Sequence, residues 1–129
     1  MLNKINFLTA GESHGKGLLG IIEGIPSGLE IEQQYIDFHL SRRQKGFGRG
    51  ARMKIEKDSA EIYTGVRLGY TLGSPIGLII SNLDWPNWKD TMATDKQDKE
   101  QKKITLPRPG HADLAGIMKH EFDDIRNVI

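Results

Sequence analysis

The chain has 129 residues, of which 37% are apolar and 27% charged, enough for one domain with one modest core. Its 18 basic and 17 acidic side chains leave a net charge of +1, which argues against nonspecific nucleic-acid binding by the whole surface. With no cysteine, the chain has no disulfides and no thiolate chemistry. It begins without the apolar run of a signal peptide and has no stretch near the ~20 apolar residues of a membrane-spanning helix. We therefore expect a soluble, cytoplasmic protein with no membrane partner.

The first two thirds of the chain predict mainly strands. Alternating apolar residues predict a strand over residues 4–10, and a short apolar run predicts another over residues 18–25. The spacing of Ile31, Tyr35 and Phe38 predicts a helix over about residues 32–43. Strands this closely spaced favour an α+β fold, in which an antiparallel sheet packs against helices. Further alternation predicts an antiparallel hairpin between Met53–Ile55 and Ile62–Val66, and a strand over residues 76–81.

The last third breaks this pattern. Residues 84–103 contain five acidic residues and five lysines, which predicts a mobile polar excursion with Trp85 and Trp88 packed at its start. From Ala112, apolar residues at helical spacing predict one helix that continues to Ile129. That apolar stretch has no stop signal behind it, so we expect a fragment, or a helix buried against another chain. We assign residues 1–129 to one domain.

The strongest single signal is the stretch from Arg42 to Lys54. It has six basic residues, three glycines and no acidic residue in thirteen positions. Glycine lets backbone N–H groups approach an anion, and arginine binds phosphate oxygens in pairs. A phosphorylated small molecule and RNA both fit this composition. Phe47 is the only aromatic residue there, where several would be expected for RNA, so the small anion is favoured and nucleic acid is not expected.

Two unusual turns contain histidine, the side chain best suited to proton transfer near neutral pH. His14 lies in a glycine-rich loop after the first strand, and His111 follows Arg108-Pro109-Gly110 directly before a helix. Both turns also have a plain structural interpretation: the first as a strand connection with a surface histidine, the second as a helix start capped by Asp113. Neither matches a known glycine-rich nucleotide loop. His39 and His120 read as ordinary helix residues.

A metal site is not predicted. Glu12, His14, His111 and Asp113 carry ligand groups, but their spacing matches no metal motif and the nearby arginines would repel a cation.

Five motifs of the chain are long and chemically unusual: Thr9-Ala10-Gly11-Glu12-Ser13-His14-Gly15, Arg42-Arg43-Gln44-Lys45-Gly46-Phe47-Gly48-Arg49-Gly50, Thr71-Leu72-Gly73-Ser74-Pro75-Ile76, Arg108-Pro109-Gly110-His111-Ala112-Asp113 and Asp124-Ile125-Arg126-Asn127-Val128. Together they strongly resemble the chorismate synthase family, in collinear order along the whole chain.

The resemblance implies a lyase of aromatic amino acid biosynthesis. Family members form chorismate from 5-enolpyruvylshikimate 3-phosphate by a 1,4-elimination, the last common step of the shikimate pathway, using reduced FMN; in bifunctional members NADPH reduces the flavin. The implied fold is a sandwich of sheets around central helices, in a homotetramer, and residues 1–129 would form the N-terminal part of this single domain. Family members are considerably longer, so the resemblance implies activity for a full-length protein rather than for these residues alone.

The resemblance also implies roles for individual residues. His14 and His111 would be the catalytic proton donors. Arg43 and Arg49 match positions of the cofactor and anion site, while Ser13, Arg49 and Arg108 match substrate positions. We add Arg52 to the substrate residues from its place in the basic stretch. Two other hypotheses stay open: an RNA-binding module, and a structural unit without activity of its own.

Overall fold

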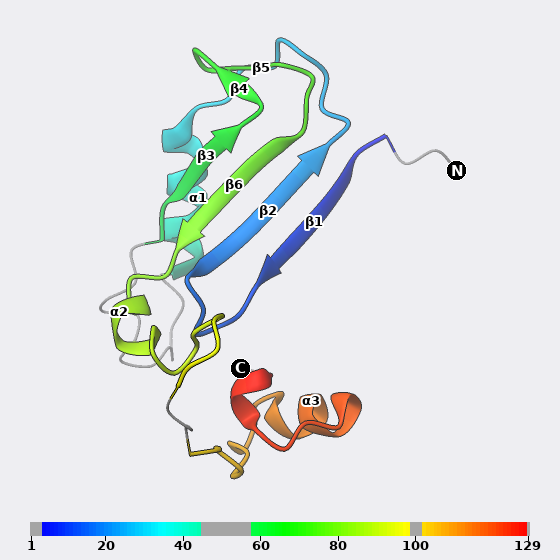
Figure 1. The fold of residues 1–129 in the computed structure, drawn as a ribbon. Helices are drawn as coiled ribbons and strands as arrows, with labels where there is room; N and C mark the ends of the chain where they lie inside the picture. The colour runs from blue at the N-terminus through cyan, green and yellow to red at the C-terminus, as the bar shows by residue number, and fades with distance from the viewer. Residues whose placement is uncertain (1–3, 45–57, 99–101, 129) are drawn as a thin grey trace.

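The computed structural model describes residues 4–44, 58–98 and 102–128, and an antiparallel sheet forms its centre. The sheet has four strands in the order β1-β2-β6-β3 (Figure 1). Its strands are β1 (Asn6–Gly11), β2 (Gly17–Glu23), β3 (Ala60–Thr64) and β6 (Ile76–Ser81). The predicted strands over residues 4–10, 18–25 and 76–81 are therefore confirmed within two residues at each end.

The buried residues of this sheet lie on one face, at β3 and β6, although Phe7 of β1 shares that face and is 77% exposed. The register pairs Ile22 with Ile76 and Ala60 with Ile80, and Ala60 and Ile76 are buried. Because side chains alternate along a strand, Leu8, Leu19 and Ile21 share the opposite face. Their exposed fractions are 67%, 50% and 47%, so that apolar face is largely open within the described residues.

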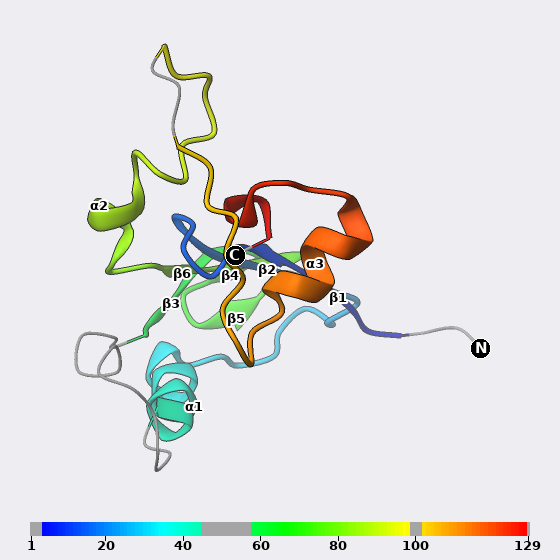
Figure 2. The ribbon, with the colours of Figure 1, turned by 90° about the horizontal axis from the view of Figure 1, so that it is seen from below.

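Helix α1 (Gln33–Gln44) lies along one side of the sheet (Figures 1 and 2). The Gln33 side chain connects it to β3 by donating to the Ala60 carbonyl oxygen, and Ser59 Oγ donates to Asp37 Oδ1 at 2.8 Å. The predicted helix over residues 32–43 is confirmed. Its apolar spacing does not produce a buried stripe, because Tyr35 is 65% and Phe38 56% exposed.

The predicted hairpin is only partly testable. Its first arm, Met53–Ile55, lies outside the described residues. The second arm was predicted to run through Val66, and this is wrong: β3 ends at Thr64, and Val66 begins a small separate hairpin of β4 (Val66–Arg67) and β5 (Tyr70–Thr71). Gly65 between them has φ of +83°, a conformation that glycine adopts without strain and that ends the strand.

The polar segment after β6 begins with a short helix, α2 (Trp85–Trp88). Both tryptophans are partly buried, which confirms the prediction that they pack at the start of this segment. The mobility predicted for residues 84–103 stays a prediction.

The predicted C-terminal helix is too long. Helix α3 spans Asp113–His120 and stops where Glu121 takes a left-handed conformation, with φ of +56°. A short 3-10 helix, η2 (Ile125–Asn127), follows and buries Ile125. The apolar spacing after residue 120 arises from this second element, capped by Asp124 accepting from the Arg126 backbone N–H at 3.1 Å. None of the helices in the described parts of the chain is long and apolar enough to cross a membrane.

Candidate functional site

His14 lies in the tight turn that joins β1 to β2. The Gly15 backbone N–H donates to the Glu12 carbonyl oxygen at 3.2 Å and closes the turn. The Ser13 hydroxyl is 2.9 Å from His14 Nδ1. His14 is only 6% exposed, so it is not the surface histidine of the plain structural interpretation.

Helix α2 packs against this turn through its two tryptophans. The Trp88 ring centroid is 4.0 Å from that of His14, and the ring planes are tilted by 54°. The Lys16 ammonium lies 5.9 Å from the centroid of the Trp85 ring, a cation–π arrangement. A short helix thus covers the turn with one aromatic ring on the imidazole and another near the lysine.

The turn that carries His111 is stabilised by an ion pair between Arg108 and Asp113. Arg108 Nε and Nη2 donate to the Asp113 carboxylate at 2.8 and 2.9 Å, and the Arg108 backbone N–H donates to it at 3.0 Å. Asp113 is 2% exposed and lies in the first turn of α3. These hydrogen bonds from Arg108 hold the pKa of Asp113 well below its usual range and raise that of Arg108. Two of the five N–H donors of the guanidinium are therefore used within the turn.

His111 itself is exposed, between Gly110 and the start of α3. Its backbone N–H donates to the Arg108 carbonyl oxygen at 3.3 Å. Gly110 has φ of +77°, a left-handed conformation that lets the chain reverse before the helix. The plain interpretation of a helix start capped by Asp113 is wrong, because the N-cap is Ala112 without a side-chain hydrogen bond, and the Asp113 carboxylate instead binds the arginine that begins the turn.

Both histidine turns lie at one end of the sheet, together with α2, α3 and the C-terminal end of α1 (Figures 1 and 2). A cavity of about 1020 Å³ opens beside the first turn, and none of residues 108–113 of the second turn lines it. Glu12, Gly15 and Lys16 of the first turn contribute to its lining, whereas neither histidine does. Convergence of the two imidazoles on one ligand therefore stays a prediction.

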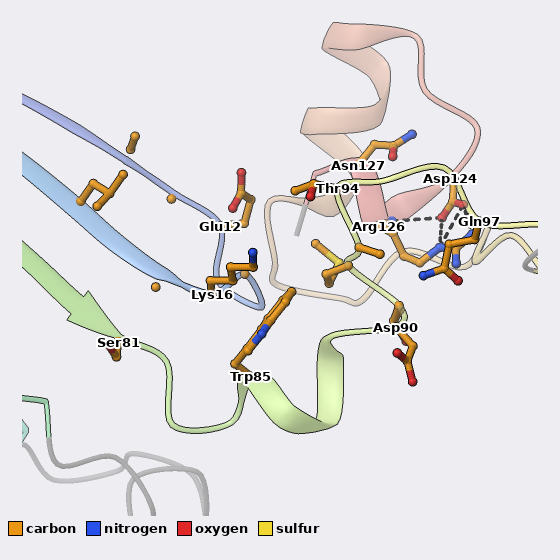
Figure 3. A pocket seen from close by; sticks show the side chains of 18 of the residues that line it. Glu12, Lys16, Ser81, Trp85, Asp90, Thr94, Gln97, Asp124, Arg126 and Asn127 are labelled. Carbon is orange, nitrogen blue, oxygen red and sulfur yellow. Dashed lines mark hydrogen bonds and ion pairs between the residues drawn. The ribbon is translucent and has the colours of Figure 1, made fainter.

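The cavity carries mixed charge on its two sides (Figure 3). Glu12, Lys16 and Trp85 lie on one side, and Asp124 and Arg126 on the other. Arg126 donates to the Asp124 carboxylate through Nε at 3.0 Å and also through Nη2, which lowers the pKa of Asp124 and raises that of Arg126. This pair is internally neutralised. The Lys16 ammonium, by contrast, lies near the neutral ring of Trp85.

The remaining predicted residues are distributed as follows. Arg43 is exposed in the last turn of α1, next to Arg42, whose guanidinium lies 5.8 Å from the Phe38 ring centroid. Arg49 and Arg52 lie outside the described residues. His39 and His120 are exposed helix residues. In the described ranges, no three histidine, aspartate or glutamate side chains gather closely enough to hold a metal ion.

Sequence reasoning missed the residues that support the first histidine turn. Asn82 and Asp84 follow β6: Asn82 binds the turn, and Asp84 binds Trp88 of α2. The only signal was their position beside two tryptophans in a segment otherwise poor in apolar residues.

Comparison with known proteins identifies the family. The profile of the family described as chorismate synthase matches residues 5–128. The chain belongs to the chorismate synthase family. It is 60% identical over 126 residues to the chorismate synthase of Pelodictyon phaeoclathratiforme and 56% identical over 129 residues to that of Aquifex aeolicus. These alignments cover 97% and 99% of this chain.

The structure agrees with this assignment. A solved structure described as "Crystal Structure of Chorismate Synthase" matches with a TM-score of 0.67 and 42% sequence identity, over 98% of this chain and 28% of that one. The predicted α+β class with an antiparallel sheet is confirmed, as is the resemblance drawn from the motifs. The chain spans about a third (32%) of the length of the curated chorismate synthases that it matches.

Proposed function

We propose that these 129 residues, joined to the rest of a family-length chain, catalyse the chorismate synthase reaction. The substrate is 5-enolpyruvylshikimate 3-phosphate, and the products are chorismate and inorganic phosphate. The observation that carries the proposal is the family match over residues 5–128, with relatives named chorismate synthase at 57–60% identity. On this proposal the protein works in aromatic amino acid biosynthesis, in the cytoplasm and as a homotetramer.

The elimination needs two bonds to break on the substrate ring. The C–O bond to phosphate breaks with its electron pair leaving on the phosphate, and a ring C–H bond breaks so that a new double bond forms. A phosphate leaves more readily when a general acid protonates it. His14 and His111 are proposed as the proton donors, one toward the departing phosphate and the other toward the flavin. Their location at the same end of the sheet supports this assignment.

Cationic and hydroxyl side chains are proposed to bind the substrate anion. Arg108 keeps three N–H donors beyond the two bound by Asp113, which suits a second, bidentate contact with phosphate. Ser13, beside His14, would donate its hydroxyl to the substrate. Arg49 is proposed for the same anion from the family resemblance, and Arg52 from its place in the basic stretch.

We propose that Arg43 and Arg49 contribute to an FMN site. Arg43 lies in the last turn of α1, toward the same end of the sheet as the histidine turns, and its exposed guanidinium suits the FMN phosphate. Arg49 is proposed for the same group. Reduced FMN, when bound, supplies electron density that is returned within each turnover, because the elimination causes no net oxidation or reduction. The residues of this chain would hold its phosphate and keep a proton near it.

A chimaera tests the proposal most directly. This chain would replace the corresponding 129-residue segment of the Aquifex aeolicus relative. Chorismate and phosphate formation would be measured without oxygen, with photoreduced FMN, beside the 129-residue chain alone and the unaltered relative. We expect the chimaera to form both products and the short chain alone to form neither.

The control separates folding from activity. If the chimaera binds FMN as tightly as the unaltered relative but forms no chorismate, the proposed function is wrong for this chain.

A further inference from the structure

The backbone of the first histidine turn is hydrogen-bonded by Asn82, the residue directly after β6. Asn82 Nδ2 donates to the Gly15 carbonyl oxygen at 2.8 Å. Its backbone N–H donates to the Lys16 carbonyl oxygen at 2.9 Å. One asparagine thus fixes two consecutive carbonyls immediately after His14.

The same asparagine begins a second chain of hydrogen bonds. Asn82 Oδ1 accepts from the Asp84 backbone N–H at 3.0 Å, and Asp84 Oδ2 accepts from Trp88 Nε1–H at 2.8 Å. The other carboxylate oxygen, Oδ1, accepts from Asn87 Nδ2 at 2.7 Å. The Asp84 carboxylate therefore fixes the indole plane at the end of α2.

The two chains of contacts meet at the imidazole. Trp88, oriented by Asp84, packs its ring 4.0 Å from that of His14, while Asn82 binds the backbone one residue beyond it. The Ser13 hydroxyl contacts Nδ1 on the same ring. A buried ring that is held by a tilted indole, at one nitrogen and through its backbone has few rotamers left. Such pre-organisation is what proton transfer requires.

We propose that Trp88, oriented by Asp84 and Asn82, is a positioning residue for His14. The proposal rests on the proposed function, in which His14 donates a proton. Trp88 would act through the orientation of the imidazole and would not touch the substrate.

Trp85 provides a matched control in the same helix. It is also a partly buried tryptophan, but its ring faces Lys16 rather than His14. Substituting either tryptophan removes an indole from α2, so a general loss of packing affects both variants. Only the Trp88 substitution removes the ring against the imidazole.

The first measurement uses the 129-residue chain and needs no activity. In histidine-labelled protein, the proton signals of the His14 ring should be displaced by the ring current of the adjacent indole. Trp88→Leu should abolish this displacement, whereas Trp85→Leu should leave the His14 signals in place. Unchanged His14 signals in Trp88→Leu would overturn the proposal whatever the protein catalyses.

The second measurement uses the chimaera. Trp88→Leu should lower kcat about 10- to 100-fold with KM within about twofold, because a misplaced proton donor weakens the transition state more than substrate binding. Trp88→Phe, which keeps a ring against His14, should recover most of kcat. A rise in KM with kcat unchanged, or a Phe variant no better than Leu, would contradict the positioning role.

A further variant covers the case in which Trp88→Leu does not fold. Asp84→Ala leaves the indole in the chain but removes the acceptor that orients it. It should move the His14 signals and lower kcat in the same direction as Trp88→Leu, and no change in either would count against the proposal. An inactive chimaera with displaced His14 signals would contradict the proposed function alone.

Discussion

The two histidine turns are built in opposite ways. His14 is 6% exposed, and its ring contacts Trp88 and Ser13 directly. His111 is exposed, and the strong interactions of its turn join the residues on either side, Arg108 and Asp113. The first turn thus fixes a side chain, whereas the second fixes the backbone that carries one.

Because of this difference, the two histidines should contribute differently to the stability of the fold. A buried ring contributes to packing, so its removal leaves a cavity. An exposed ring contributes little to packing, so its removal leaves the fold intact. Two residues with the same proposed chemical role should therefore respond differently to the same substitution.

The largest expected effect comes from replacing each histidine by alanine. In the chimaera, His14→Ala and His111→Ala should each lower the rate of phosphate release about 10²- to 10⁴-fold, the usual contribution of a general acid. In the 129-residue chain, His14→Ala should also lower the free energy of unfolding by about 2 kcal/mol, since it empties a packed site. His111→Ala should change it by no more than about 0.5 kcal/mol.

His39→Ala serves as a control for both measurements, because His39 is exposed on α1 and has no proposed role. Near-normal phosphate release by both active-site variants would remove their assigned role. Equal destabilisation by both would contradict the comparison of a buried with an exposed ring.

A smaller effect should come from the ion pair that supports His111. The pKa of Asp113 is lowered by its hydrogen bonds from Arg108, so the folded state favours the ionised carboxylate. Its stabilisation is therefore present above the unfolded pKa of about 4 and is lost as the pH falls through the lower folded pKa. Asp113→Asn should destabilise the chain at pH 7, and the difference from the unsubstituted chain should shrink as the pH falls below about 4.

Urea unfolding at pH 7 and at decreasing acid pH measures this difference. Asp123→Asn is the comparison variant, because Asp123 also has a lowered pKa but pairs with Lys103 at the exposed surface. A surface pair contributes little to stability, so its pH dependence should be weaker. A difference for Asp113→Asn that stays constant down to the lowest pH would show that the ion pair does not stabilise the turn.

The contrast between the turns also explains what could be predicted from sequence. Strands β1, β2 and β6 have local apolar alternation or runs, and such patterns depend only on neighbours in the chain. The predicted C-terminal helix is too long because glutamate at position 121, unlike glycine or asparagine, does not indicate a left-handed conformation that ends a helix. Its conformation follows from the Phe122 backbone N–H donating to the Ile117 carbonyl oxygen at 3.1 Å.

For the two histidine turns, too, only contacts between residues close in the sequence could be predicted. The motif around His111 contains both partners of its ion pair within six residues, so a close reading of Arg108 to Asp113 indicates a turn of special geometry. Trp88, however, is 74 positions from His14 along the chain, and only the pairing of β2 with β6 brings the two together. No local pattern carries that information. The residues that support the buried histidine could therefore be identified only from the three-dimensional structure.

The smallest expected effect on activity comes from backbone strain at Gly110, in the second histidine turn. Gly28, far from that turn along the chain, provides the comparison. Gly110 and Gly28 have nearly the same left-handed conformation, with φ of +77° and +83°, and an added Cβ would meet no atom within 4 Å at either position. Alanine at either position should therefore lower the free energy of unfolding by a similar amount, about 1–2 kcal/mol, from backbone strain alone. Only Gly110 directly precedes His111.

We expect Gly110→Ala to lower kcat of the chimaera while Gly28→Ala leaves it near that of the unsubstituted protein. Thermal unfolding of both variants would verify that the loss of stability is matched. The rate of phosphate release would then show whether the changed backbone at Gly110 impairs His111. Because the second histidine is placed by its backbone, a change in backbone conformation at Gly110 should move the imidazole without removing any side-chain contact. Equal activity of the two variants, with matched loss of stability, would mean that His111 tolerates displacement, and that the backbone of its turn is not what positions it.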